Sequence, residues 1–307
     1  MFPLLPLEEV PLGLARAEVE RQFAPFTRVD DAAWERRFER RNRKVWRQYL
    51  RRRLLFWSAQ RRRDRDAVRE EYAAGRRGLG TESYRLDAAA DARSLWRWGE
   101  RRSFAASSGG TRLRVLLLAQ AIALLKPQRV LEIGCGSGIN LLLLAGGFPE
   151  TAFTGLDLTP ERIATAKQLQ AQNTALPLHL QTFAPFPLAD PTAFRRVTFQ
   201  TGDAAALPYT DNSFDLVITV LALEQMQRIL RPALRELARV AAGHAFMIEP
   251  FHEANATGIA RRYVIAQDYL QARITTLPRH GLHPLWATAD LPQEAFMRAC
   301  AVLAKAA

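Results

Sequence analysis

The stretch VLEIGCGSGIN, residues 130–140, places three glycines two residues apart: Gly134, Gly136 and Gly138. Glycine has no Cβ, so such a turn can adopt backbone conformations that other residues avoid and can touch a ligand directly. The dinucleotide fingerprint G-x-G-x-x-G would need a glycine where Ile139 stands, and the chain has no G-x-x-x-x-G-K-[ST] to hold a triphosphate. The turn therefore predicts a ligand held by close backbone contact, without a phosphate requirement.

Two carboxylates follow the glycine turn, each near the end of an apolar run. Asp157 is the penultimate residue of AFTGLDL (152–158), and Asp203 is the last residue of VTFQTGD (197–203). A carboxylate in the first position can accept hydrogen bonds from both hydroxyls of a ribose. Asp203 can accept from an exocyclic adenine amine, and the backbone N–H of Ala204 lies next to it. Together with the glycine turn, these residues predict an adenosine site.

Apolar runs alternate with helical patterns between residues 112 and 250, which favours a parallel sheet with right-handed crossovers. Ligands bind such sheets beyond the carboxyl ends of the strands, where the glycine turn and both carboxylates fall. The stretch 171–196 is long, and we expect it to be a surface insertion. The expected strands cover residues 127–134, 152–158, 197–203, 214–220 and 244–250, and the expected helices cover 112–125, 139–145, 160–172 and 232–241.

Four motifs follow one another along this part of the chain: VLEIGCGSG, GLDLTPERIATAK, GDAAALPYTDNSFDLVIT and ALEQM. In this order they resemble the motifs of class I S-adenosylmethionine-dependent methyltransferases, in the ubiquinone/menaquinone-type branch (methyltransferase domain 11-like). The resemblance covers roughly residues 112–250. It implies an α/β, Rossmann-like fold with a seven-stranded, mostly parallel sheet, helices on both faces and a reversed last strand. HPLWATAD and AFMRACAVLAKA would supply the final hairpin, and S-adenosylmethionine is the implied cofactor.

The resemblance also implies which residues hold the cofactor. Glu132 and the glycine turn would line its methionine end, and Asp157 would bind the ribose. Leu158 would pack on the adenine, whose edge Asp203 and Ala204 would bind. The expected cofactor-binding residues are Glu132, Gly134, Cys135, Gly136, Gly138, Asn140, Asp157, Leu158, Asp203, Ala204 and Val220.

Methyl transfer from a sulfonium is an in-line displacement, for which an enzyme supplies mainly alignment. A general base is needed only if the acceptor must lose a proton. Many relatives carry a histidine after the glutamate of the ALEQM motif, whereas this chain has Gln225. Glu224 could also orient the cofactor or cap a helix. Two further candidates, Tyr263 and Tyr269, could be core or lid residues. The candidate catalytic residues are Glu224, Glu249 and His252, followed by Tyr263 and Tyr269.

The N-terminal third carries most of the positive charge. Residues 1–110 hold 25 Lys and Arg against 16 Asp and Glu, which accounts for 9 of the formal net charge of +12. One helical pattern runs over 31–72 and a second over 86–104, and ASSGG (106–110) is typical of a linker. We therefore expect a basic, helical N-terminal extension or lid (1–110) and an S-adenosylmethionine-binding methyltransferase domain (111–307). The extension could cover an anionic, partly apolar acceptor, pack as a solvated helix on the main domain, or bind RNA.

These patterns predict a methyltransferase that acts on a small, anionic or amphiphilic metabolite. Two alternatives stay open: an RNA methyltransferase, for which no RRM, KH or OB signature is present, and a non-catalytic scaffold that binds an adenosyl ligand. Apolar runs such as VLLLAQAIALL (115–125) are shorter than a membrane span, and no basic leader precedes Glu8. The two cysteines lie far apart and form no metal-binding pattern. We accordingly expect a cytoplasmic protein with a small-molecule partner rather than nucleic acid, without a transmembrane segment or metal site.

Overall fold

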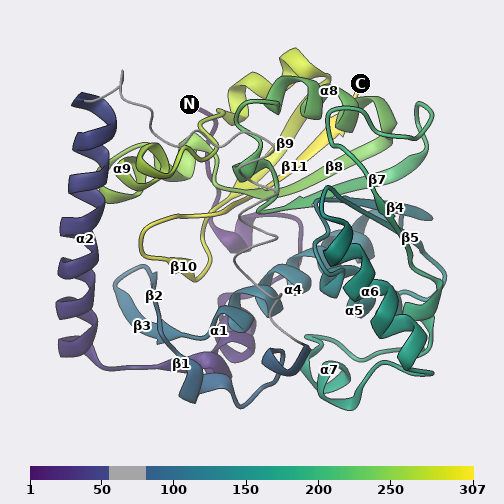
Figure 1. Ribbon diagram of the computed structural model, residues 1–307, viewed down its shortest axis with the longest axis horizontal. Coiled ribbons are helices and arrows are strands. Elements are labelled where there is room, and N and C mark those ends of the chain that lie inside the picture. Colours follow the sequence, from purple (N-terminus) through teal and green to yellow (C-terminus); the bar gives the residue numbers. More distant parts are fainter. Residues whose placement is uncertain (55–80) are drawn as a thin grey trace.

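A seven-stranded sheet forms the centre of the protein in the computed structural model, which describes residues 1–54 and 81–307 (Figure 1). Neighbouring strands follow the order β6-β5-β4-β7-β8-β11-β9. The first five are parallel, and β11 runs antiparallel to both β8 and β9. This confirms the predicted sheet with one reversed strand and its C-terminal hairpin. The strands are Arg129–Ile133 (β4), Ala152–Asp157 (β5), Thr198–Thr201 (β6), Phe214–Val220 (β7), Ala241–Glu249 (β8), Leu282–Thr288 (β9) and Cys300–Ala306 (β11).

Helices cover both faces of this sheet, as predicted (Figure 1). Successive strand residues point to opposite faces, so Val130 joins one core and Leu131 the other. The first core is closed by α4 and its neighbours α5 and α6, and the second by α8. The near-continuous apolar sequences of β4 and β7 follow from this burial on both faces. These helices are Ser107–Leu125 (α4), Ile139–Gly147 (α5), Pro160–Gln172 (α6) and Leu230–Val240 (α8).

Helix α4 contains the apolar stretch VLLLAQAIALL (115–125). It is the one described helix whose length and composition would suit a membrane span, and about two thirds of it is buried inside the protein. Leu116, Leu117 and Leu118 are all buried in the core beneath the sheet. The apolar character of α4 is thus explained by its packing.

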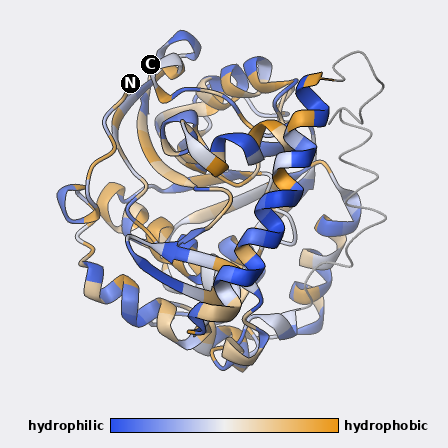
Figure 2. Cartoon of the chain, turned by 90° about the vertical axis from the view of Figure 1, so that its left-hand side faces the viewer, coloured by the Kyte–Doolittle hydropathy of each residue, from blue (hydrophilic) through white to orange (hydrophobic). Residues whose placement is uncertain are grey.

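Helix α2 (Asp31–Leu54) confirms the helical pattern predicted from residue 31, while the remainder of that prediction, 55–72, lies outside the described residues. Trp34 is buried, and its ring stacks on Phe38 with centroids 4.9 Å apart. The helix faces the viewer in Figure 2, where hydrophilic residues cover most of its length. Near its end, Arg52 forms an ion pair of 2.7 Å with Asp268, just beyond α9 (Gly258–Gln267). The inner face of α2 is thus packed and its outer face is solvated.

A second, smaller sheet joins the N-terminal region to the far end of the chain. Its order is β1-β3-β2-β10, and all its pairs are antiparallel. The edge strand β10 comes from beyond β9, so the last part of the chain completes a sheet begun by the first. The strands are Thr27–Arg28 (β1), Ser94–Trp98 (β2), Arg101–Ala105 (β3) and Gln293–Glu294 (β10).

The helix predicted over 86–104 is wrong, because β2 and β3 form a hairpin there. The chain turns at Gly99, whose φ is +56°. Leu95 belongs to a small core beside α2, whereas Trp96 packs on Phe23, with ring centroids 5.0 Å apart, in the main core. Adjacent residues thus face two different cores, which a strand allows and a helix does not.

The linker predicted at 106–110 is also wrong, since this stretch begins α4. Close packing explains its small residues. A Cβ on Gly109 would lie 2.7 Å from Phe26 Cβ, and one on Gly110 would lie 2.7 Å from Cη2 of Trp96. The two glycines let the N-terminal region approach the helix closely. The proposed division at residue 110 stays a prediction, and α4 continues across it.

The stretch 171–196 is packed into the protein rather than laid over its surface. It contains α7 (Leu178–Phe183), and Phe183 and Phe194 are fully buried. The Phe183 ring lies 5.4 Å from that of Tyr84, measured between centroids, and its carbonyl accepts a hydrogen bond from the guanidinium of Arg112. The insertion therefore supports the N-terminal region.

Asp290, in the turn after β9, binds the N-terminal region to the C-terminal part. Its Oδ2 accepts from the Leu7 N–H at 3.1 Å and from Arg16 Nη1 at 3.0 Å. Its Oδ1 accepts from Trp98 Nε1 at 2.8 Å. One carboxylate thus joins three separate N-terminal segments.

Candidate functional site

A cavity of about 310 Å³ opens at the carboxyl ends of the central strands β4, β5 and β7. This is the end at which parallel sheets bind ligands. Of the predicted cofactor-binding residues, all but Gly138 line the cavity. Residues that end different strands thus meet in one space.

The three glycines after β4 all have positive φ angles, of 76°, 56° and 77° in chain order. A Cβ on Gly134 would lie 2.4 Å from Ala222 Cβ, and one on Gly138 would lie 2.4 Å from the Phe199 ring. Packing against neighbouring elements therefore excludes side chains at these two positions. This explains why Gly138 is absent from the cavity wall although the motif requires it.

Asp157 fixes the middle of the glycine turn. Its Oδ2 accepts from the Gly136 N–H at 2.8 Å, and its Oδ1 accepts from the Thr159 N–H at 2.9 Å. Each carboxylate oxygen can accept more than one hydrogen bond, so both retain capacity for a ligand hydroxyl. Leu158, beside it, is half-buried and lines the same wall.

Glu132 and Asn140 form a buried polar pair at the base of the cavity. Asn140 Nδ2 donates to Glu132 Oε1 at 2.7 Å. The other oxygens, Glu132 Oε2 and Asn140 Oδ1, are buried and have no hydrogen-bond partner within the described part of the chain. Burial raises the pKa of Glu132 to about 7, against the lowering effect of the Asn140 hydrogen bond. Two unsatisfied acceptors side by side suit a cationic donor.

Cys135 packs beneath the turn. A Cβ on Gly155 would lie 2.8 Å from its sulfur, so β5 leaves room for the thiol. Burial raises the pKa of Cys135 well above the usual thiol value, with further contributions from Glu132 and Asp157. A neutral, packed thiol is a poor nucleophile, in keeping with a small turn residue.

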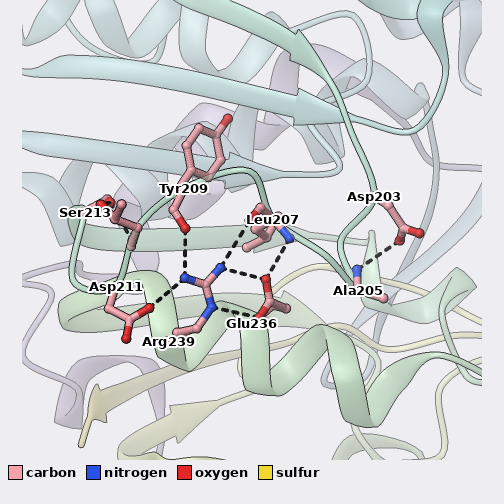
Figure 3. A network of polar contacts seen from close by, with 9 residues as sticks. Asp203, Ala205, Leu207, Tyr209, Asp211, Ser213, Glu236 and Arg239 are labelled. Atoms are coloured by element: carbon pink, nitrogen blue, oxygen red, sulfur yellow. Dashed lines mark hydrogen bonds and ion pairs between the residues drawn. The ribbon is translucent and has the colours of Figure 1, made fainter.

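Asp203 and Ala204 lie where the chain leaves β6. Asp203 Oδ1 accepts from the Ala205 N–H at 2.9 Å, which bends the loop immediately after the strand (Figure 3). Ala204 is buried and lines the cavity together with Asp203 and Gly202. The loop thus presents a carboxylate and a buried backbone segment to the same space.

Arg239, on α8, holds the rest of this loop (Figure 3). Its guanidinium donates to the carbonyls of Leu207 and Tyr209, at 3.1 and 2.8 Å, and to Asp211 Oδ1 at 2.7 Å. Glu236 pairs with Arg239 at 2.8 Å and accepts from the Leu207 N–H at 2.7 Å. These hydrogen bonds raise the pKa of Arg239 above its usual value. The sequence analysis missed this pair, although their spacing of three on one helix was visible.

Glu249 ends β8 with no exposed surface and does not line the cavity. Its carboxylate accepts from the N–H groups of Ala222, Leu223 and Glu224 at 2.9, 3.0 and 3.2 Å. Burial raises its pKa to about 7, while these hydrogen bonds act in the opposite direction. Glu249 therefore positions the loop that follows β7.

The other predicted catalytic residues also lie away from the cavity wall. Glu224 is buried and accepts from Gln225 Nε2 at 2.6 Å. His252 packs beyond β8, where burial, Arg273 and Arg261 lower its pKa. Tyr263 and Tyr269 do not line the cavity either, and their rings lie 6.1 Å apart between centroids beside α2.

The cavity is also lined by residues that the sequence analysis did not identify. Burial raises the pKa of Tyr84, while Arg114 and Arg162 act to lower it. Arg51, Arg52 and Arg53 of the predicted lid do not line the cavity. Arginine within the apolar helix α4 was a sequence signal that could have indicated Arg114 as a lining residue. The residues concerned are Tyr84, Thr111, Arg114, Arg162, Arg228 and Ile229.

Comparisons with known proteins concern mainly the part of the cavity formed by the glycine turn and the loops after β5, β6 and β7. Residues 131–248 match the profile of the family described as "Methyltransferase domain". The chain is 31% identical over 123 residues to ajmaline N-methyltransferase from Rauvolfia serpentina, covering 40% of this chain and 35% of that protein. It is 29% identical over 140 residues to the ubiquinone/menaquinone biosynthesis C-methyltransferase UbiE of Methylobacterium nodulans, covering 45% and 48%.

Among solved structures, the chain aligns with that of N-methyltransferase NodS from Bradyrhizobium japonicum WM9. The two align with a TM-score of 0.44 and 17% identity, covering 64% of this chain and 94% of that one. The chain spans less than half the length of the two curated relatives described above. Tyr84, Thr111 and Arg114 lie outside the family match.

Proposed function

We propose that this chain is an S-adenosylmethionine-dependent methyltransferase that acts on a small, anionic methyl acceptor, because residues 131–248 match the family described as "Methyltransferase domain". The cofactor would occupy the wall formed by the glycine turn and the loops after β5 and β6. The acceptor would enter beside Arg114 and Tyr84.

The unsatisfied oxygens of Glu132 and Asn140 carry this proposal. Both are buried acceptors on the cavity wall, and the methionine end of S-adenosylmethionine offers an ammonium group to bind there. Asp157 retains acceptor capacity for the ribose hydroxyls, and Leu158 and Ala204 offer apolar contact to the adenine. When bound, the cofactor supplies a methyl group on a positively charged sulfur.

The residues of this chain would act mainly by positioning. Asp157 holds the glycine turn, Glu249 holds the loop after β7, and Arg239 holds the loop after β6. Because these supports are charged and partly buried, the wall keeps its shape before a ligand arrives. Preorganisation of this kind lowers the entropic cost of aligning two reactants.

We assign Glu224 and Glu249 to positioning as well. Neither lines the cavity, and Glu249 is occupied by three backbone donors. A base is unnecessary if the acceptor presents a lone pair at neutral pH.

The positive charge in the cavity lining supports an anionic acceptor. Arg114, Arg162 and Arg228 all line the cavity. Guanidinium groups bind carboxylates and phosphates through charge-assisted hydrogen bonds, which are about twice as strong as neutral ones. An anionic group on the acceptor would therefore be drawn to these arginines, of which Arg114 lies on α4, outside the strand-end loops that carry Asp157 and Asp203.

The test begins with calorimetry of S-adenosylmethionine binding to the full chain. Labelled cofactor is then incubated with a metabolite extract separated into anionic, neutral and cationic fractions. We expect label to move into the anionic fraction. Cofactor binding without transfer to any fraction would favour the scaffold alternative, and absence of binding would exclude the proposal.

An RNA acceptor is the alternative that the basic outer face of α2 favours. The described part of this helix has no acidic residue after Glu39, while Arg and Lys recur up to Arg53. Filter binding of RNA across a salt series tests it. RNA binding that weakens steeply with salt, together with methylated RNA, would replace the small-molecule proposal.

A further inference from the structure

A second cavity, of about 60 Å³, lies next to the main one. Apolar side chains make up most of its wall, among them Leu113 and Leu117 of α4, Ile248 of β8 and Met297. The polar residues that line this second cavity are Gln293 and Glu294 of β10, together with Trp96 and Arg114. The proposed cofactor-binding residues do not line this second cavity.

Arg114 and Leu221 line both cavities and so stand between them. Helix α4 runs past both: Thr111 faces the main cavity, Leu113 and Leu117 face the second, and Arg114 reaches each. A ligand group that passed Leu221 would leave a charged, polar space and enter an apolar one.

Arg114 is not neutralised by a close carboxylate. Its guanidinium donates to Thr111 Oγ1 at 3.2 Å, and within residues 1–54 and 81–307 it forms no ion pair. Glu294, Tyr84 and Glu224 attract it from farther away, while burial lowers its pKa. By contrast, the neighbouring Arg112 is occupied by Gln22 and two backbone carbonyls. Arg114 therefore retains donors for an anion.

Leu221 is held in place by its backbone. Its φ of +52° lies in the left-handed region, which is costly for leucine. Its N–H donates to the Ile248 carbonyl at 3.0 Å, and the three residues after it are bound by Glu249. Strain of this kind persists only where the surroundings fix it, so the boundary between the cavities is a built feature.

We propose that the second cavity binds a short apolar group of the methyl acceptor, while Arg114 binds its anionic group. The acceptor is then an amphiphilic anion, such as a carboxylate with a short hydrocarbon chain. This inference rests on the proposed function, because it assumes that the main cavity holds the cofactor. The apolar lining of the second cavity would bind the hydrocarbon chain of the acceptor, and the guanidinium of Arg114 would bind its anionic group.

The experiment measures the binding of straight-chain carboxylates from acetate to octanoate by calorimetry, with the full protein saturated with S-adenosylhomocysteine. We expect affinity to rise about fourfold with each added methylene until the cavity is filled. Hexan-1-ol, which has the chain without the charge, should bind at least tenfold more weakly than hexanoate. Equal affinities for acetate and hexanoate would overturn the inference and indicate a packing void.

Three variants locate the effect. Ala299→Leu, which narrows the second cavity, should lower hexanoate affinity at least tenfold and leave acetate unchanged. Leu113→Ala, which widens it, should move the optimum to a longer chain. Arg114→Gln should remove the preference for hexanoate over hexan-1-ol. Ala171→Leu, on the exposed end of α6, is the matched control.

Binding of S-adenosylmethionine is measured for every variant. If wild type fails to bind the cofactor, the proposed function fails. If the cofactor binds normally but chain length has no effect in wild type, or Ala299→Leu does not change hexanoate affinity, only the second-cavity inference fails. A folded state is verified for each variant by its thermal unfolding.

Discussion

The two walls of the main cavity are built in different ways. The cofactor wall consists of turns that end neighbouring strands, between Glu132 and Val220, and charged side chains fix each turn locally. The proposed acceptor wall is assembled from Tyr84, Thr111 and Arg114, which the N-terminal region and α4 bring together. The first wall is encoded by contiguous motifs. The second depends on packing between segments distant in sequence.

This difference implies that the walls should respond differently to substitution. Changes on the cofactor wall should affect S-adenosylmethionine binding, and those on the acceptor wall should spare it. The largest expected effect comes from the support beneath the cofactor wall.

Glu249→Ala should be the most damaging change, because it leaves three buried N–H groups without an acceptor. Each unsatisfied group costs about 1–3 kcal/mol, so the free energy of unfolding should fall by at least about 3 kcal/mol. Thermal and denaturant unfolding measure the loss. Glu249→Gln, which keeps one acceptor, should lose less, and Glu150→Gln on the surface should lose nothing. A fully stable Glu249→Ala protein would contradict the assignment of Glu249 to positioning.

Asp157→Ala should weaken S-adenosylmethionine binding on the order of 100-fold, since hydrogen bonds to a charged group contribute about 1.5–3 kcal/mol. The loss has two sources: the ribose contacts and the anchoring of Gly136. Calorimetry measures it, with Asp87→Ala as an exposed control. Unchanged affinity would overturn the cofactor assignment as a whole.

Arg114→Gln should separate the walls most clearly. We expect cofactor affinity to change less than about twofold and methyl transfer to the anionic fraction to fall at least tenfold, the effect of losing one charge-assisted contact. Arg129→Gln, in an exposed ion pair with Asp215, is the matched control. If Arg114→Gln weakened cofactor binding as strongly as Asp157→Ala does, the two walls would not be separate.

The smallest effect concerns pH and the buried pair of Glu132 and Asn140. The pKa of Glu132 is raised to about 7 by burial, and its ionised form should bind an ammonium group better. Affinity for S-adenosylmethionine should therefore rise by about eightfold from pH 6 to pH 7.5, in proportion to the ionised fraction. Calorimetry at intervals of half a pH unit measures this, and Glu132→Gln should flatten the profile. A flat wild-type profile would remove Glu132 from contact with the ammonium group.

The sequence allowed the central sheet to be predicted because its signals are local. Apolar runs, the glycine turn and Asp157 lie within short stretches. Because the carboxyl ends of parallel strands lie at the same edge of the sheet, residues that end these strands are expected to lie together. The reversed strand β11 followed from the resemblance rather than from its alanine-rich sequence. Glu132 and Asn140 reach the cavity because they flank the turn.

The errors share one cause, which is packing between distant segments. A helical pattern was predicted over 86–104, but β2 is held by β3 and by β10 from the far end of the chain. The small residues at 106–110 suggested a linker, whereas Gly109 and Gly110 fit against Phe26 and Trp96. Glu249 suggested catalysis because it ends a strand at the expected active edge, and Glu224 because it lies in the ALEQM motif. The three backbone donors that bind Glu249 and the Gln225 amide that binds Glu224 became visible only in three dimensions.

The hydrogen bonds that Asp290 accepts from three N-terminal segments have a consequence for the synthesis of the protein. Leu7, Arg16 and Trp98 leave the ribosome long before Asp290 and β10, so the acceptor wall lacks its outer support during most of synthesis. A nascent chain released before residue 290 would expose the open edge of β2 to other chains. Synthesis of Asp290 and β10 is thus also the step that protects the N-terminal strands from aggregation.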